Sequence, residues 1–169
     1  MAGLAALRPR PGDVPGYATR VALRELGRRA RFLDAQIGQL DELIIPLVTA
    51  RAPGLLALHG VGPDTAARLL IAAGDHPARL RSEAAWAHLC GVAPIPASSG
   101  KVRRHRLNPG GNREANHALW RIVITRMSSH PATRAYAARR IREGLTEKEI
   151  IRCLKRYVAR EVYRHVHAG

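Results

Sequence analysis

The sequence is poor in aromatic residues and in cysteine. Phe, Tyr and Trp make up only 4% of the 169 residues, which argues against a surface that stacks successive bases of single-stranded nucleic acid. The two cysteines, Cys90 and Cys153, form no CxxC pair and have no second pair with which to build a zinc site. We therefore expect both to be buried, reduced thiols, and Trp86 and Trp120 to belong to the core.

Acidic residues and long apolar runs are scarce as well. Only 13 Asp and Glu oppose 28 Lys and Arg, which gives a formal charge of +15. This balance favours the phosphate backbone of nucleic acid as a partner, although a basic surface without that function is an alternative. No stretch approaches the roughly 18 apolar residues of a membrane span, and no signal peptide is recognisable. We expect a cytoplasmic protein that has no membrane partner.

The first 50 residues divide into a leader and a long helix. Residues 1–17 contain several helix breakers and are expected to be disordered. Over 18–50, apolar residues alternate at spacings of three and four, the a/d pattern of a coiled-coil helix that Pro46 should kink or end. This helix could pair with a second copy, or its apolar face could pack on the body of the same chain. The seam comprises Leu26, Ala30, Leu33, Ile37, Leu40, Ile44 and Leu47.

Residues 55–73 are typical of a helix-hairpin-helix. A short helix, a glycine-containing turn and a second helix follow one another, and Pro63 suits the first turn of the second helix. Backbone N–H groups at Gly60, Val61 and Gly62 could approach a phosphate, helped by the helix dipole. The alternative is an ordinary tight turn between two helices.

The rest of the chain is expected to be helical apart from 92–111. Helices are predicted over 83–89, 113–127 and 132–143, and a capping box at Thr146 and Glu149 should start a last helix that ends near residue 166. The expected fold is all-α, with a helical domain over 53–169 and at most a short hairpin at 101–107. One basic face is expected on the last helix, from Arg152, Lys155, Arg156, Arg160 and Arg164.

The irregular segment over 92–111 carries the residues most suited to chemistry. Ser98, Ser99 and Gly100 directly precede a cluster of cations. A serine that attacks a phosphodiester needs the developing charge neutralised, which arginines can do without a metal. Residue types alone favour a flexible loop that merely contacts phosphate. The basic and polar candidates are Lys101, Arg103, Arg104, Arg106, Asn112 and Arg113. None of the histidines has a metal-binding spacing such as HExxH, so no metal site or cofactor is expected in this chain.

Three stretches, in this order and spacing, resemble the carboxy-terminal transposase domain of the insertion sequence 110 family, also grouped with types 116 and 902. They are LLALHGVGPDTAARLLIAAGD, AAWAHLCGVAPIPASSGKVRRHRLNPGGNREANHALWRIV and RAYAARRIREGLTEKEIIRCLKRYVAREVY. The resemblance implies a nucleophilic serine that links covalently to DNA. The matching residue is Ser99, with Ser98 as the adjacent alternative. Gly111, Asn112 and Arg113 would shape the loop or contact phosphate.

The resemblance also implies parts that this sequence lacks. The family has an amino-terminal RuvC-like domain with four acidic metal-binding residues, then a coiled-coil linker that the Leu26–Leu47 seam would match. A divalent metal is therefore expected only in that missing domain. We expect this chain to be the DNA-binding part of a transposase or site-specific serine recombinase, incomplete as an enzyme by itself, with a guide RNA as a second candidate partner. The alternative is a non-enzymatic helix-hairpin-helix module that binds the DNA or RNA backbone.

Overall fold

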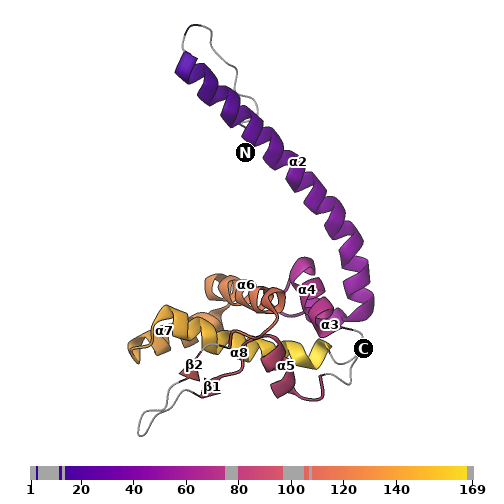
Figure 1. Cartoon of the computed structure of the whole chain (residues 1–169), viewed down its shortest axis with the longest axis vertical. Coiled ribbons are helices and arrows are strands. Elements are labelled where there is room, and N and C mark those ends of the chain that lie inside the picture. Colours follow the sequence, from indigo (N-terminus) through magenta and orange to yellow (C-terminus); the bar gives the residue numbers. More distant parts are fainter. Residues whose placement is uncertain are drawn as a thin grey trace. The chain divides into compact units, whose positions relative to one another are not determined.

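The computed structural model describes residues 3, 12, 14–74, 80–96, 105–106 and 108–166, and they fall into two compact units, 1–43 and 44–169. Helices dominate both units, and the only strands among the described residues are two residues long. This confirms the all-α prediction (Figure 1). No helix within the described part of the chain has the length and apolar character needed to cross a membrane.

Helix α2 (Val14–Arg51) is longer than predicted at both ends. Residues 14–17 are helical, so this part of the predicted leader is wrong. Pro15 lies in the first turn, where its missing N–H costs nothing, and its carbonyl oxygen accepts a hydrogen bond from the Thr19 hydroxyl at 2.9 Å. The remainder of the leader, 1–2, 4–11 and 13, lies outside the described residues.

Pro46 does not end α2, which continues to Arg51. Proline removes one hydrogen bond from the helix interior. Two side chains beyond it, Val48 and Ala52, are buried in the core of the second unit. Tertiary packing of this kind stabilises a helical turn more than propensity does. Of the two expectations for Pro46, that it ends the helix is wrong, and that it kinks the helix stays a prediction.

Among its described residues, the second unit contains six helices besides the end of α2. They are α3 (Pro53–Leu56), α4 (Pro63–Ala73), α5 (Glu83–Leu89), α6 (Arg113–Ser129), α7 (Pro131–Arg142) and α8 (Glu147–Val166). Helix α6 packs against α4, α7 and α8, and α8 also packs against α3 and α5, as Figure 1 shows. The largest fully buried side chains come from most of these elements: Leu55, Leu69, Trp86, Leu119, Ile122, Val123, Ile150 and Val162.

The predicted helix starts are confirmed by their caps. The Ser82 hydroxyl accepts a hydrogen bond from the Ala85 N–H at 3.1 Å at the start of α5. Before α8, the Thr146 N–H donates to the Glu149 carboxylate at 2.9 Å, and the Thr146 hydroxyl donates to it at 2.6 Å. Such caps satisfy amide groups that a helix start leaves without partners.

Two short strands interrupt the irregular segment, β1 (Ile95–Pro96) and β2 (His105–Arg106). They pair antiparallel, with Ile95 opposite Arg106 and Pro96 opposite His105. The hairpin predicted within 101–107 therefore has wrong bounds, because its first strand lies upstream of that range. Proline is tolerated at an edge strand such as β1, since no second neighbour needs its N–H.

The core predictions hold for Trp86 and fail for Trp120. Trp86 is fully buried, whereas Trp120 is 41% exposed and stacks on His117 with ring centroids 5.5 Å apart. The buried face of α6 follows helical spacing through Ala115, Ala118, Leu119 and Ile122, and position 120 lies off that face. Both cysteines are free thiols, Cys90 buried and Cys153 half-buried. Burial raises the pKa of the Cys90 thiol to about 12.

Candidate nucleic-acid interface

The turn between α3 and α4 lies against α6. Gly60 has a φ of +79°, a conformation that glycine adopts readily, and a Cβ there would lie 3.3 Å from the Ile122 carbonyl oxygen. Arg126 of α6 fixes the turn, because its Nε donates to the His59 carbonyl oxygen at 2.7 Å. Its guanidinium also pairs with Glu161 of α8 at 2.6 Å. The turn is thereby a fixed part of the second unit.

Two amide groups of this turn are already used within it. The Val61 N–H donates to the Leu58 carbonyl oxygen at 3.1 Å, and the Gly62 N–H donates to the Thr65 hydroxyl at 3.1 Å. Asp64, in the first turn of α4, pairs with Arg68 at 2.9 Å. A carboxylate at a helix start occupies the place that the helix dipole would offer to a phosphate. Phosphate contact by Gly60, Val61 and Gly62 stays a prediction, and the geometry leaves few donors for it.

The two ends of the segment over 92–111 meet at one point. A Cβ on Gly111 would overlap the Cα and N atoms of Gly91, and would lie 3.0 Å from the Cys90 carbonyl carbon. Gly91 has a φ of +65°, which turns the chain away from α5. The Asn112 N–H donates to the Leu89 carbonyl oxygen at 2.6 Å. The segment therefore leaves the helical body after α5 and re-enters it before α6 at a closed base.

Two asparagines at the start of α6, the capping Asn112 and Asn116 of the first turn, hold this base. Asn112 caps the helix, with its side-chain oxygen accepting from the Ala115 N–H at 2.9 Å. One turn later, Asn116 donates from Nδ2 to the Cys90 carbonyl oxygen at 2.8 Å, while its Oδ1 accepts from the Lys155 Nζ at 2.9 Å. A chain of hydrogen bonds thus joins α8, α6 and the start of the segment. Asn116 was not among the predicted site residues, although its spacing of four from Asn112 places both on one helix face.

A cavity of about 770 Å³ lies beside the closed base. Its wall includes Gly91, Val92, Ala93 and Pro94, the side chain of Arg106 from β2, and the α8 residues Glu149, Arg152, Lys155 and Arg156. The Glu149 carboxylate serves as the α8 cap, and the hydrogen bonds from the Thr146 hydroxyl and amide lower the pKa of Glu149. Arg156 pairs with Glu83 of α5. The cavity is lined by more cations than carboxylates.

The predicted single basic face of α8 is wrong. Lys155 is only 8% exposed, and Arg156 and Arg160 both pair with Glu83. Burial, together with the charge of Arg152, lowers the pKa of the Lys155 ammonium. Residues three and four apart share a helix face, but here Lys155, Arg156 and Arg160 contact α5 or α6 within the unit. Of the five predicted cations, this leaves Arg152 and Arg164 as the exposed ones without an ion pair among the described residues.

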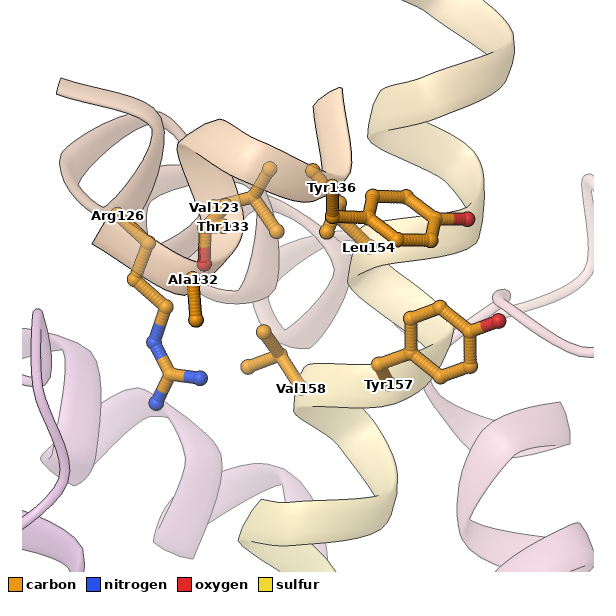
Figure 2. A pocket seen from close by; sticks show the side chains of 8 residues that line it. All are labelled: Val123, Arg126, Ala132, Thr133, Tyr136, Leu154, Tyr157 and Val158. Atoms are coloured by element: carbon orange, nitrogen blue, oxygen red, sulfur yellow. The ribbon is translucent and has the colours of Figure 1, made fainter. Parts of the chain in front are cut away.

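A second, smaller hollow of about 200 Å³ has a different character. It lies among α6, α7 and α8, and Figure 2 shows the Arg126 guanidinium directed away from the rings of Tyr136 and Tyr157. The two rings meet edge to face at 5.7 Å. Burial and the hydrogen bond with Tyr157 raise the pKa of Tyr136 to about 12. Its mainly apolar wall offers no reactive arrangement.

The structure unites only part of the predicted site. Arg106 lines the cavity, Asn112 forms the closed base, and Arg113 begins α6 with an exposed side chain. The α3–α4 turn meets α6 near Ile122, so at 1.5 Å per residue it lies about 15 Å along the helix from Asn112. Within the described ranges, no group of three or more His, Cys, Asp or Glu side chains is arranged to hold a metal ion. The candidates outside the described residues are Ser98, Ser99, Lys101, Arg103 and Arg104.

Comparison with known proteins supports the resemblance seen in the sequence. The model of the Transposase IS116/IS110/IS902 family matches residues 52–138. A 43.6 kDa protein of insertion element IS110 from Streptomyces coelicolor is 34% identical over 144 residues, which are 85% of this chain and 34% of that protein. A 42 kDa protein of insertion element IS900 from Mycobacterium paratuberculosis is 28% identical over 149 residues, 85% of this chain and 37% of that protein.

A third relative is named for a DNA rearrangement. The pilin gene-inverting protein of Moraxella bovis is 32% identical over 127 residues, 73% of this chain and 39% of that protein. The chain spans between about a third and two fifths of the length of these relatives. The family match covers more than half of the chain and includes the closed base, its two glycines and the segment between them. The chain therefore belongs to the IS116/IS110/IS902 transposase family.

Proposed function

We propose that this chain binds DNA for a transposition or inversion reaction and contributes Ser99 as the nucleophile that attacks the DNA backbone. The observation that carries the proposal is the closed base at Gly91 and Gly111, beside a cavity lined by cations. A loop fixed at both ends can present a serine to a phosphate at low entropic cost. Family membership and the name of the Moraxella relative favour DNA as the partner.

The proposed reaction is a transesterification at phosphorus. The Ser99 hydroxyl loses its proton and its oxygen forms a bond to phosphorus, while one bridging P–O bond to deoxyribose breaks. The released sugar oxygen takes up a proton, so the step needs no oxidant or reductant. Negative charge builds on the non-bridging oxygens, and fixed cations stabilise it most in a site from which water is partly excluded. Arg103, Arg104, Arg106 and Arg113 are the proposed cations, and Lys101 is a further phosphate contact.

The chain is proposed to work with parts supplied by other segments or molecules. The acidic, divalent-metal domain of the family would supply metal-assisted chemistry at the same DNA. A structured guide RNA is a second proposed partner. Binding to RNA of the cognate element, compared with a scrambled RNA of equal length and at fixed salt, tests that partner, because unspecific phosphate binding would not distinguish the two.

Covalent trapping tests the serine directly. The chain is incubated with cognate DNA ends carrying a nick, so that a short cleaved fragment diffuses away and the covalent product accumulates. The expected result is a protein–DNA adduct that disappears in Ser99→Ala and persists in the matched control Ser98→Ala. The reaction is run with the chain alone and with the acidic domain of the family added separately.

Each outcome of the trapping experiment decides a different point. An adduct with the chain alone makes it self-sufficient for the first chemical step. An adduct only with the added domain makes the active site composite. Adduct loss in Ser98→Ala but not in Ser99→Ala assigns the nucleophile to the neighbouring serine. Salt-sensitive DNA binding with no adduct in either condition refutes the nucleophile proposal and leaves a binding module.

We also propose that α2 pairs with a second copy through the Leu26–Leu47 seam. In the first unit, Leu26 is 65% exposed, Ile37 56% and Leu40 55%, and rows of exposed apolar side chains favour helix pairing. Leu33→Asp should abolish a dimer that light scattering detects in the unaltered chain. Gln39→Asp, at an exposed position on the face of the helix away from the seam, is the matched control and should leave the dimer intact. A chain that is monomeric before any substitution refutes this pairing.

A further inference from the structure

Two cations are buried among the described residues, and their surroundings differ. Arg126 is 7% exposed and pairs with the carboxylate of Glu161. Lys155 is 8% exposed, and its one hydrogen-bond partner among the described residues is the neutral Asn116 oxygen at 2.9 Å. An ammonium group has three N–H donors, so this contact uses one of them. A buried charge without a counter-charge is costly, and Lys155 lines the cavity beside the closed base.

The cations around Lys155 are not balanced by carboxylates in the wall of the cavity. Arg106 and Arg152 line the same cavity, and in the described part of the chain neither forms an ion pair. Glu149 is the single carboxylate of the wall, and it accepts both hydrogen bonds from Thr146. The single charge of Glu149, which also attracts Arg152, balances at most one of the three cations, so the remaining positive charge around the hollow is repulsive. An anion in the cavity would remove that repulsion and use the remaining Lys155 donors.

We propose that this cavity is a binding site for one backbone phosphate of the nucleic acid, held by Lys155, Arg152 and Arg106. The assignment rests on the proposed function for the choice of phosphate over other anions. A volume of about 770 Å³ is within the range of small-ligand sites and admits a phosphodiester with its flanking sugars. The Lys155–Asn116–Cys90 chain of hydrogen bonds would couple that phosphate to the closed base. Lys155 is thus a phosphate-binding residue that also positions the segment containing Ser99.

Replacing single backbone phosphates of the DNA by an uncharged linkage tests the contact between Lys155 and phosphate directly. Duplexes carry a single methylphosphonate, which has no charge, at successive positions around the cleavage point, and affinity is measured for each. In the unaltered chain, a methylphosphonate at one position should weaken binding by at least about tenfold, a conservative limit because losing one partner of a buried charge contact weakens binding by about thirtyfold or more. In Lys155→Met the same methylphosphonate should change affinity by less than about threefold, because the contact is already absent. Equal losses in both proteins at every position overturn the proposal.

Control variants separate this contact from general charge and from folding. Arg164→Met removes an exposed cation from the same helix and should leave the methylphosphonate profile of the unaltered chain in place. Lys155→Arg should still lose about tenfold in affinity when the methylphosphonate is at that position, since arginine keeps the charge. If Lys155→Met fails to fold, Arg152→Met serves instead, because the Arg152 side chain is exposed and its replacement should not disturb folding. Arg152→Met should reduce the loss of affinity caused by the methylphosphonate at the same position. A flat profile in the unaltered chain is contrary to the proposal.

Free phosphate distinguishes a backbone site from a general anion site. Inorganic phosphate should shift the NMR signal of the Lys155 ammonium and compete with DNA in the unaltered chain, and Lys155→Met should remove the competition. If inorganic phosphate binds at Lys155 but no methylphosphonate position depends on Lys155, the assignment to a backbone phosphate is overturned. Ser99→Ala should keep the methylphosphonate effect that depends on Lys155 and should form no adduct. The proposal for the serine and the proposal for the phosphate site can therefore be refuted independently.

Discussion

Replacing Gly111 by alanine tests the closed base most sharply. A Cβ at this position would overlap the Cα and N atoms of Gly91, and both partners are backbone, so no side chain can move aside. The adjacent hydrogen bond from the Asn112 N–H to the Leu89 carbonyl oxygen, at 2.6 Å, must lengthen if the two segments separate. Gly111→Ala should therefore open the base of the segment that carries Ser99.

The magnitude follows from three opposing contributions. Forcing a methyl group into a packed contact costs about 1–3 kcal/mol, and losing a hydrogen bond costs about 1 kcal/mol. Removing glycine from the unfolded chain stabilises by about 0.4–1 kcal/mol. The net loss in the free energy of unfolding should be about 1–3.5 kcal/mol, which lowers a urea midpoint by about 1 M.

The neighbouring glycine is the matched control. A Cβ on Gly110 would lie 3.5 Å from the Asn108 side-chain oxygen, an ordinary contact, and Gly110 does not have a positive φ. Urea unfolding followed by circular dichroism should place Gly110→Ala within about 0.5 kcal/mol of the unaltered chain. Equal stability of Gly111→Ala and Gly110→Ala would falsify the close approach of the two glycine backbones.

Three further substitutions or conditions probe other parts of the second unit. Arg126→Met should lower the free energy of unfolding by about 1–2 kcal/mol, because it removes a hydrogen bond to the His59 carbonyl oxygen and an ion pair with the partly exposed Glu161; a urea curve that matches the unaltered chain contradicts this. The pKa of Glu149 lies below its ordinary value of 4.5. The cap therefore contributes to the free energy of unfolding above pH 4.5, and this contribution is lost as the pH falls through the lowered pKa. Glu149→Gln should flatten this part of the pH–stability profile. A thiol reagent at pH 8 should modify Cys153 and spare Cys90, whose pKa of about 12 leaves almost no thiolate; rapid labelling of Cys90 would show that its burial is wrong.

Local signals in the sequence predicted the helices well. Ser82 and the Thr146–Glu149 pair have caps that depend only on residues within one turn, and their pattern can be recognised without the fold. The end of α2 escaped prediction because Val48 and Ala52 are stabilised by the core rather than by neighbours in the chain. Trp120 was misplaced because hydrophobicity alone does not fix which side of a helix is covered.

The residues that form the site are brought together by contacts between positions far apart in the sequence, and no local pattern in the sequence indicates these contacts. Lys155 contacts Asn116 across 39 positions, and Arg156 contacts Glu83 across 73. A helical repeat of cations gives the same pattern whether the cations face solvent or a carboxylate. The closed base is a partial exception, because glycines at both ends of an irregular segment indicate a tight turn at each end, although not that the two touch.

Net charge does not by itself locate a nucleic-acid surface. An excess of cations along α8 points equally to Arg152, Lys155, Arg156 and Arg160, yet Arg156 and Arg160 share the carboxylate of Glu83 within the unit. An exposed arginine without a carboxylate is solvated and costs little, so its presence says little about function. A buried ammonium with only an amide oxygen beside it is costly, and Lys155 keeps that arrangement next to the segment that carries Ser99. The burial of Lys155 therefore locates the candidate phosphate site more specifically than the total of 28 cations does.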